Sequence, residues 1–558
     1  MKLITALTLL GAVADQVTVA LAKGSSFGPP RPMGHPFSME DALAMDAAAA
    51  GAGTAEERTA LDRRQSDRFG TEAFFDQLID HKNPSLGTFK QRYWYNAERY
   101  AGPGSPIVMY NAGESDARDF TGYMSNWTMS GLLAQNVGGA AIVLEHRYWG
   151  KSSPYSVMTI ANLTHLNIDN AIADMTRFAR EVELPFAPKA ATDPAKAPWV
   201  LFGTSYSGAL AAFTERLDPG VFWAYYGSSA AIHSIGNFWH YFRPVQLGMP
   251  RNCSADVNRV LAKIDSVLLN GTADDRVALK TRFGLQTVED LDFADALAKG
   301  PYQWQYTDYS TGYGDFYQWC DYVENAHPKA YPNATAPGPD GVGADKALEG
   351  YARWMKEVLI PKTCDSDDMV DCFGHLDPNN TWYTNFTVSF AGGNRPWQWL
   401  VCNEPLQSWP NGAPEGYPTL HSRLIQMPYQ ESGCRLMFRE QKVGNEVYTY
   451  GMARGLTADD VNRRMLGGFN YAKPTHRLLY VNGEFDPWLD ETVSSVLRPG
   501  GPMRSTDAQP VLILPGGGHA TDMLAYMGDY NAGAKKVQEQ AMAIMVKWVK
   551  EHPSMKGR

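Results

Sequence analysis

The chain has 558 residues, of which 44% are hydrophobic and 20% charged, and its formal net charge is −10. This is the composition of a globular protein long enough for a large buried core, in one elaborated domain or several smaller ones. The charges are scattered and form no Lys- or Arg-rich block, so we expect no nucleic-acid partner.

Residues 1–22 have the pattern of a secretory signal peptide, with a basic start, an apolar run and small residues, and cleavage is expected after Ala14 or after Ala22. The run is too short to span about 30 Å of hydrocarbon, so we expect no membrane anchor. Residues 23–66 are rich in Gly, Pro and Ala and end near a dibasic pair, which favours a propeptide or linker. We therefore expect a secreted protein, or one delivered to a vacuole- or lysosome-like compartment.

Residues 67–235 alternate short apolar runs with helix-like segments, which is typical of a parallel sheet covered by helices. Between the second and third of these runs, apolar residues at helical spacing predict a helix whose start is capped by Thr164. The runs predict four buried strands, at residues 107–110, 141–144, 199–202 and 223–226.

The same pattern returns in residues 466–558, with strands predicted at 477–481 and 511–514 and a closing amphipathic helix that ends before Pro553. Residues 236–465 lose the alternation, show helical patterns and contain all six cysteines. We interpret the chain as one α/β domain interrupted by a large, mostly helical insertion that lies as a lid over one edge of the sheet.

Secretion gives meaning to the cysteines and to the glycosylation sequons. An even number of cysteines in an oxidising compartment predicts up to three disulfides, whose pairing the sequence leaves open. No Cys-x-x-Cys pair occurs, so we expect no zinc site. The cysteines are Cys253, Cys320, Cys364, Cys372, Cys402 and Cys434. Several N-glycans are expected among the sequons at Asn126, Asn162, Asn252, Asn270, Asn333, Asn379 and Asn385.

The sharpest chemical signal is a serine in a small-residue turn between a predicted strand and a helix, in the run Gly203-Thr204-Ser205-Tyr206-Ser207-Gly208. Strand and helix approach each other closely at such a turn, and the strained serine is lifted above the sheet. Ser207 stands where the common Gly-x-Ser-x-Gly pattern has its second glycine, and serine is small enough for that place. The pattern predicts a nucleophile elbow with Ser205 as the nucleophile.

Two later strands lead to the partners that such a serine needs. The strand predicted at 477–481 runs into a loop with Asp486, and the strand predicted at 511–514 runs into a glycine-rich loop with His519. Serine, acid and histidine follow one another in this chain order in the α/β hydrolases. We predict that His519 takes the proton of Ser205 and that Asp486 orients the imidazole. The alternatives for the acid are Glu484, Asp490 and Asp522.

The fold class that follows is α/β: an α/β-hydrolase core with a large, mostly helical, disulfide-stapled lid insertion. Attack of a serine on a carbonyl group forms a tetrahedral intermediate with a negatively charged oxygen, and backbone N–H donors are required to stabilise that oxygen. One donor is expected from Tyr206, directly after the nucleophile, and another from the loop after the strand at 107–110, where Gly113 permits close approach. Glu114, the next residue of this loop, is a candidate for substrate binding. An ordinary turn is the alternative for the loop.

Several motifs in one order resemble the serine peptidase family that includes prolyl carboxypeptidase, dipeptidyl peptidase II and the secreted fungal prolyl endopeptidases. The resemblance runs through most of the chain after Phe69. Departures from the family pattern occur at Ile79, Thr204 and Ser207. The motifs stand at residues 75–81, 88–94, 113–114, 145–152, 203–208, 227–230, 397–404, 483–488 and 518–519.

The resemblance implies a helical lid between the core halves and hydrolysis on the carboxyl side of proline. It also implies that Trp488 lines the pocket for the residue before the cut, and packed core is the alternative role for this side chain. We interpret Glu145-His146-Arg147-Tyr148 as a hydrogen-bonded network that supports the core.

Two other functions fit the same fold: a carboxylester hydrolase and a non-catalytic binding protein. The sequence lacks the His-Gly-Gly-Gly oxyanion segment common in esterases, and it retains all three triad residues. It contains no His-Glu-x-x-His motif, phosphate-binding loop or dinucleotide fingerprint, so we expect no metal and no cofactor. The expected partners are peptide substrates. The sequence leaves open the oligomeric state, the pH optimum, and whether cleavage is terminal or internal.

Overall fold

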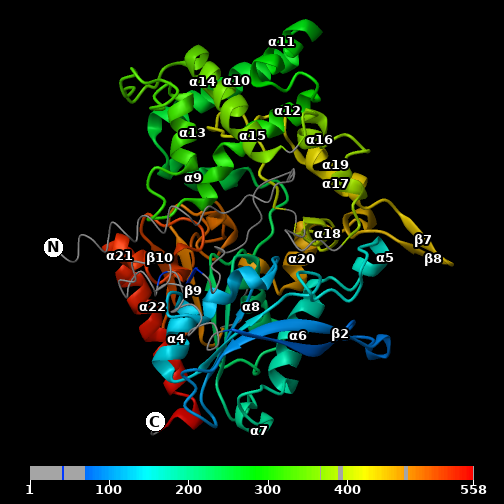
Figure 1. Ribbon diagram of the computed structural model, residues 1–558, viewed down its shortest axis with the longest axis vertical. Helices are drawn as coiled ribbons and strands as arrows, with labels where there is room; N and C mark the ends of the chain where they lie inside the picture. Colours follow the sequence, from blue (N-terminus) through cyan, green and yellow to red (C-terminus); the bar gives the residue numbers. More distant parts are fainter. Residues whose placement is uncertain are drawn as a thin grey trace, which may run out of the picture.

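The computed structural model describes residues 41, 42, 45 and 70–556, apart from 365, 388–393, 407 and 471–474. The predicted signal peptide and almost all of the predicted propeptide lie outside the described residues. In Figure 1 the sheet and its covering helices occupy the lower half of the molecule, and a separate group of helices forms the upper half.

One eight-stranded sheet with the order β1-β2-β4-β3-β5-β6-β9-β10 forms the centre of the core. β1 and β2 run antiparallel to their neighbours, and every pairing from β4 to β10 is parallel. This crossover order, with helices on both faces, is the α/β-hydrolase core, so the predicted fold class is confirmed. The strands are β1 (Thr71–Leu78), β2 (Thr88–Asn96), β3 (Ile107–Asn111), β4 (Ala140–Leu144), β5 (Trp199–Thr204), β6 (Ala224–Ser228), β9 (Leu478–Gly483) and β10 (Val511–Leu514).

All six strands predicted from apolar runs are present, whereas β1 and β2 were not expected. These two strands mix buried polar side chains such as Gln77 and Gln91 with buried aromatic ones such as Tyr93, so neither is a continuous apolar run. The Gln77 amide, for example, donates to Gln91 Oε1 at 2.9 Å between the two strands. Hydrophobic periodicity therefore gives no signal there, although both strands belong to the sheet.

Each face of the sheet has its own hydrophobic core. Apolar side chains of α6 (Ile168–Glu181) and α8 (Tyr206–Leu217) form the core on one face. Those of α4 (Met129–Val137) and α22 (Ala532–Lys550) form the core on the other. The two short helices α7 (Lys189–Thr192) and α21 (Met527–Tyr530) complete this part of the molecule.

The predicted cap of α6 is wrong. The helix begins at Ile168, and the side chain of Asn167 accepts the Asn170 N–H as its cap. Thr164 instead ends the preceding short helix α5 (Ile160–Leu163), because its hydroxyl donates to the Ala161 carbonyl at 2.7 Å. A threonine that bonds backwards in this way cannot cap the helix that follows.

The insertion between β6 and β9 consists of two parts with different packing. The first, the lid, has its own hydrophobic core, which runs from Phe238 to Tyr429 and includes Trp488 from beyond the insertion. Its helices are α9 (Phe242–Gly248), α10 (Arg251–Asn270), α11 (Ala273–Phe283), α12 (Asp290–Ala296), α13 (Asp315–Val323), α14 (Ala344–Trp354), α15 (Ile360–Thr363) and α16 (Met369–Phe373).

The second part packs on the core, since buried residues from Tyr383 to Met465 join the hydrophobic cluster of α6 and α8. In Figure 1 this part extends from the level where the two halves meet up to α19 (Met427–Met437), which is drawn beside α16 and contributes Tyr429 to the lid core. Its elements are α17 (Thr381–Thr384), α18 (Asn394–Asn403), α19 (Met427–Met437), the hairpin of β7 (Gln441–Val443) and β8 (Glu446–Tyr448), and α20 (Ala458–Arg464). Only the first part therefore forms a lid with an interior of its own.

The sequons differ in exposure. Asn126, Asn270, Asn333, Asn379 and Asn385 are exposed, whereas Asn162 and Asn252 are half-buried. The amide of Asn252 donates to Glu324 Oε2 at 3.0 Å, and that of Asn162 donates to the Val157 carbonyl at 2.8 Å. The exposed five are therefore the more accessible glycan acceptors. None of the described helices has the length and apolar character needed to cross a membrane.

All six cysteines pair, as the sequence predicts. Cys253–Cys320 and Cys364–Cys372 lie in the lid, and Cys402–Cys434 joins α18 to α19. No described cysteine is free. The three disulfides staple both parts of the insertion and none joins the insertion to the sheet.

We predict that the protein, denatured without reductant and treated with iodoacetamide, gains no carbamidomethyl group, because every thiol is oxidised. Peptide mapping by mass spectrometry under the same conditions should recover the three pairs given above. Reduction before alkylation is the control and should label six cysteines. Any label without reductant, or a peptide that joins Cys320 to Cys364, would contradict the fold described.

Candidate active site

Ser205 stands at the sharp turn between β5 and α8, with φ 58° and ψ −119°. A non-glycine residue in such a conformation costs ~1–3 kcal/mol, which the packing around it must offset. The residue is completely buried at the carboxyl edge of the parallel strands. This is the geometry of the nucleophile elbow that the sequence predicts.

The small residues around Ser205 are required by close backbone contacts. A Cβ atom on Gly203 would lie 2.0 Å from the Ser207 carbonyl oxygen, and one on Gly208 would lie 2.9 Å from the Ser228 carbonyl oxygen. Ser207 fills the place of the second glycine and closes the turn. Its Oγ accepts the Thr204 N–H at 2.8 Å and donates to the Thr204 carbonyl at 2.9 Å.

His519 and Asp486 are paired at the ends of β10 and β9. The His519 Nδ1 lies 2.8 Å from Asp486 Oδ1, and both side chains are buried. An ionised carboxylate only accepts hydrogen bonds, so Nδ1 carries the proton and Nε2 is the basic nitrogen. The two loops lie close together, because the Phe485 N–H donates to the Gly517 carbonyl at 2.8 Å.

The end of β6 connects the elbow to the histidine loop. The Ser205 N–H donates to the Ser228 carbonyl at 2.8 Å, and the Ser229 hydroxyl oxygen accepts the Ala520 N–H at 3.0 Å. The structure thus brings Asp486 and His519 together and places Ser205 at the end of β5, which β6 separates from β9. Among the described residues none hydrogen-bonds the Ser205 hydroxyl. In enzymes without substrate the serine–histidine contact is often long and tightens when substrate binds.

The alternative acids have other partners. Glu484 is exposed and accepts the Gly516 N–H at 2.8 Å. Asp490 forms an ion pair with Arg243 at 3.1 Å. Asp522 is buried, but it accepts hydrogen bonds from the Ser228 hydroxyl at 2.6 Å and the Tyr226 hydroxyl at 2.8 Å. Asp486 is therefore the acid that the described contacts pair with His519.

The two expected oxyanion donors have different surroundings. Tyr206 is the first residue of α8, and the N–H groups of a helix's first turn have no acceptor within the helix. The Gly113 loop lies against the elbow, since a Cβ atom on Gly113 would be 3.2 Å from the Ser207 Cβ. The Gly113 N–H itself donates to Asn111 Oδ1 at 2.8 Å, so in this arrangement it is already engaged.

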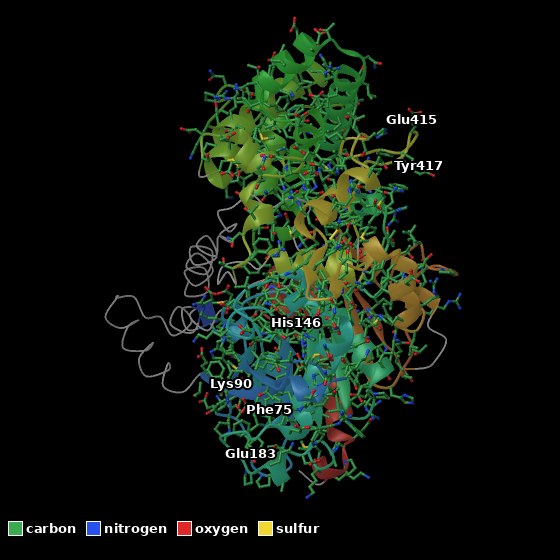
Figure 2. The ribbon with its side chains drawn as sticks, turned by 90° about the vertical axis from the view of Figure 1, so that its right-hand side faces the viewer. Phe75, Lys90, His146, Glu183, Glu415 and Tyr417 are labelled. Atoms are coloured by element: carbon green, nitrogen blue, oxygen red, sulfur yellow. A yellow bond between two sulfur atoms is a disulfide. The ribbon has the colours of Figure 1, made fainter. Side chains whose placement is uncertain are left out.

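His146 is a neighbour of the nucleophile to which the sequence analysis gave no chemical role. Figure 2 shows it near the middle of the molecule, between the sheet and the lid. Its Nδ1 lies 2.8 Å from the Arg147 carbonyl and its Nε2 lies 3.2 Å from the Tyr206 hydroxyl. Burial lowers the pKa of His146 to about 4, so the ring stays neutral. When the neutral ring donates its Nδ1–H to the Arg147 carbonyl, Nε2 is free to accept a hydrogen bond from the Tyr206 hydroxyl. This hydrogen bond orients the Tyr206 side chain.

The remaining residues of the Glu145–Tyr148 segment form the hydrogen-bonded network that the sequence predicts. Glu145 pairs with Arg92, and Ser152 donates to the same carboxylate at 2.6 Å. Arg147 pairs with Asp174. These side chains hold β2, β4 and α6 together below the site.

The two candidate substrate-binding residues are both buried. Trp488 stacks on Phe238 with ring centroids 5.9 Å apart and meets Tyr241 edge-on at 5.2 Å, and its indole N–H donates to Gln305 Oε1 at 2.8 Å. Its ring thus belongs to the hydrophobic core of the lid, where it joins the Asp486 loop to that core. The charge of Glu114 contributes to the raised pKa of Tyr206, after burial as the main cause, so this carboxylate lies near the residue that follows the nucleophile.

A family model described as Serine carboxypeptidase S28 matches residues 77–538. "Serine protease vicPa" of Bipolaris victoriae is 38% identical over 482 residues, which are 85% of this chain and 88% of that protein. "Probable extracellular serine carboxypeptidase" of Arthroderma benhamiae is 26% identical over 83% of this chain and 65% of that protein. Among solved structures, a membrane phospholipase A matches with a TM-score of 0.32 and 11% identity, over 91% of this chain and 97% of that chain.

The buried Asp522 predicts a pH dependence of stability. Burial raises its pKa from 3.8 to about 6, so the folded state holds the proton more tightly than the unfolded state. The stabilisation is complete below the unfolded pKa and is lost as the pH rises through the folded one. Asp522→Asn mimics the neutral acid and removes this titration. Relative to wild type, the variant should therefore gain up to about 3 kcal/mol in free energy of unfolding between pH 4 and pH 7.

Urea unfolding of both proteins at the two pH values measures this difference. Other groups titrate equally in both proteins, so their contributions cancel. A difference between variant and wild type that stays constant with pH would show that Asp522 does not titrate in this range.

Proposed function

Because the chain belongs to the serine carboxypeptidase S28 family of serine peptidases, we propose that it cleaves peptides on the carboxyl side of proline through an acyl-enzyme on Ser205. The observations that carry the proposal are the Asp486–His519 pair and Ser205 in elbow geometry, both at the carboxyl edge of the parallel strands. We also propose that the protein is secreted. The amino-terminal segment, the three disulfides and the name of the extracellular relative support this.

In the proposed mechanism, Ser205 Oγ attacks the scissile carbonyl carbon while His519 Nε2 takes the hydroxyl proton. Asp486 stabilises the imidazolium through the Nδ1–H. The carbonyl oxygen gains negative charge, which the Tyr206 N–H at the start of α8 is placed to stabilise. His519 then gives its proton to the leaving amine, and the acyl group remains on Ser205. A water molecule, deprotonated by His519, releases the acid and restores the serine.

The proline preference is supported by the surroundings of Trp488. An apolar, aromatic-walled site holds a rigid proline ring at little cost in conformational entropy, whereas a charged side chain would lose its hydration there. The ring of Trp488 follows the Asp486 loop directly and packs on Phe238 and Tyr241, so a group of aromatic side chains lies next to that loop. A hydrophobic pocket discriminates by only ~1–3 kcal/mol per methylene or so, so some cleavage after alanine is expected.

We predict that Ser205→Ala or His519→Ala lowers kcat by about 10⁶ and that Asp486→Asn lowers it by about 10⁴, because each removes part of one catalytic unit. Glu484→Gln is the matched control, since Glu484 is exposed on the same loop and should leave kcat within a few-fold. Turnover is measured with a fluorogenic peptide, and the melting temperature checks the fold. Near-full activity of Ser205→Ala would exclude Ser205 as the nucleophile.

For specificity, we predict a higher kcat/KM for proline than for Phe, Arg or Leu in a panel of fluorogenic peptides that differ only at the residue before the cut. Free and blocked termini in the same panel distinguish terminal from internal cleavage. Trp488→Leu should reduce the proline preference by roughly 10-fold or more through kcat/KM. Equal rates for proline and leucine in the wild type would refute the specificity. Turnover of unactivated alkyl esters together with no cleavage of any peptide would favour the carboxylester hydrolase.

A further inference from the structure

A pocket of about 390 Å³ lies away from the catalytic residues, where the second part of the insertion meets the core. It is bounded by α5, α17, the end of α19 and β7, which Figure 1 shows gathered on one side of the molecule. None of Ser205, Asp486 and His519 lines it. Its volume is within the range of ~300–1,000 Å³ found for small-molecule sites.

The pocket contains a buried cation that pairs with no carboxylate among the described residues. Arg395, at the start of α18, is only 7% exposed. Its Nε donates to the Met158 carbonyl at 2.9 Å, and its terminal nitrogens donate to the carbonyls of Tyr383 at 3.5 Å and Met437 at 3.2 Å. Each terminal nitrogen of a guanidinium has two N–H groups, so each keeps one donor with no acceptor in the described part of the chain.

Two completely buried arginines of the core, Arg92 and Arg147, differ from Arg395 in their partners. Arg92 is paired with Glu145 and Asp116, and Arg147 is paired with Asp174. No ion pair joins Arg395 to an acid among the described residues, and burial lowers its pKa to about 10. A buried charge normally requires an opposite charge to offset its desolvation. The rings of Phe386 and Phe438, 4.4 and 5.1 Å from the guanidinium carbon, offset only part of this cost.

The rest of the lining favours an apolar ligand with an anionic end. The walls are mainly apolar, and Arg439 adds a second, exposed cation at the rim. Glu440, the one acid among the lining residues, is exposed and forms no ion pair with either arginine. The apolar lining residues are Val157, Ile160, Pro378, Tyr383, Phe386, Leu436 and Met437.

We propose that this pocket binds a monocarboxylate that carries an apolar group, with the carboxylate on Arg395 and the apolar group against Ile160, Leu436 and Met437. The planar guanidinium suits a carboxylate, because its remaining N–H groups form charge-assisted hydrogen bonds with it. Two sources share this chemistry: a free aliphatic acid, and a peptide whose last residue is apolar. The site does not depend on the proposed peptidase activity, and binding is measured in the Ser205→Ala protein so that no peptide is consumed.

Isothermal titration calorimetry of the full-length Ser205→Ala protein tests the proposal with two probes, octanoate and N-acetyl-Ala-Leu. Each is paired with its neutral amide, octanamide or N-acetyl-Ala-Leu-amide. A Kd of roughly 0.1–1 mM is expected for at least one carboxylate, given its small size. The matching amide should bind roughly 10- to 100-fold more weakly, because it loses the hydrogen bonds to a charged group. The carboxylate that binds identifies the source.

Two sets of variants locate the site. Arg395→Met replaces the guanidinium with an uncharged, apolar end on an unbranched side chain. It should weaken binding roughly 10- to 100-fold. Val157 is 42% exposed at the pocket. Val157→Glu places a negative charge there and should weaken binding of the carboxylate about tenfold. Val157→Gln, whose side chain has the shape of Glu without its charge, should not. If Arg395→Met fails to fold, the comparison of Val157→Glu with Val157→Gln still tests whether the ligand binds in this pocket.

Three results would overturn the proposal. The first is no saturable binding of either carboxylate up to 10-fold above the expected Kd range. The second is equal binding of a carboxylate and its amide, which would show that the cation does not take part. The third is the same affinity for Val157→Glu and Val157→Gln, which would place the ligand elsewhere on the protein.

Discussion

The pairing of β6 with β9 is the contact on which the rest of the structure depends, because it joins two halves of the core that the insertion separates. Tyr225–Ser228 of β6 lie in parallel register with Leu478–Val481 of β9. The end of β6 then holds the elbow through the Ser228 carbonyl and holds the histidine loop through the Ser229 hydroxyl. Without this pairing, Ser205 would have no fixed position relative to Asp486 and His519.

Much of this arrangement follows from the sequence. The apolar runs predict the parallel strands because such strands are buried on both faces, and the small residues around Ser205 predict the turn that their contacts require. The order of Ser205, Asp486 and His519 predicts which loops meet. Each of these signals can be read from the residues themselves or from their order in the chain. The fold adds the positions of these residues in space.

What the sequence does not predict depends on partners distant in the chain. β1 and β2 pair through buried polar groups such as Gln77 and Gln91, which in a sequence resemble surface residues. The engagement of the Gly113 N–H by Asn111 and the orientation of Tyr206 by His146 depend on side-chain geometry that no residue pattern encodes. The division of the insertion into two parts likewise depends on which core each helix reaches. Helical periodicity marks an apolar face but not the surface that covers it.

The position of the insertion has a consequence for biosynthesis. During synthesis, β6 is complete before the lid has been made, so the edge that will accept β9 is unpaired until the last part of the chain arrives. An apolar, unpaired strand edge is a site for association with other chains. The lid has its own hydrophobic core and two internal disulfides, but the ring of Trp488, which follows β9, belongs to that core. A chain truncated after the lid would therefore combine an open sheet edge with a lid core that lacks Trp488, and both would expose apolar surface to other chains.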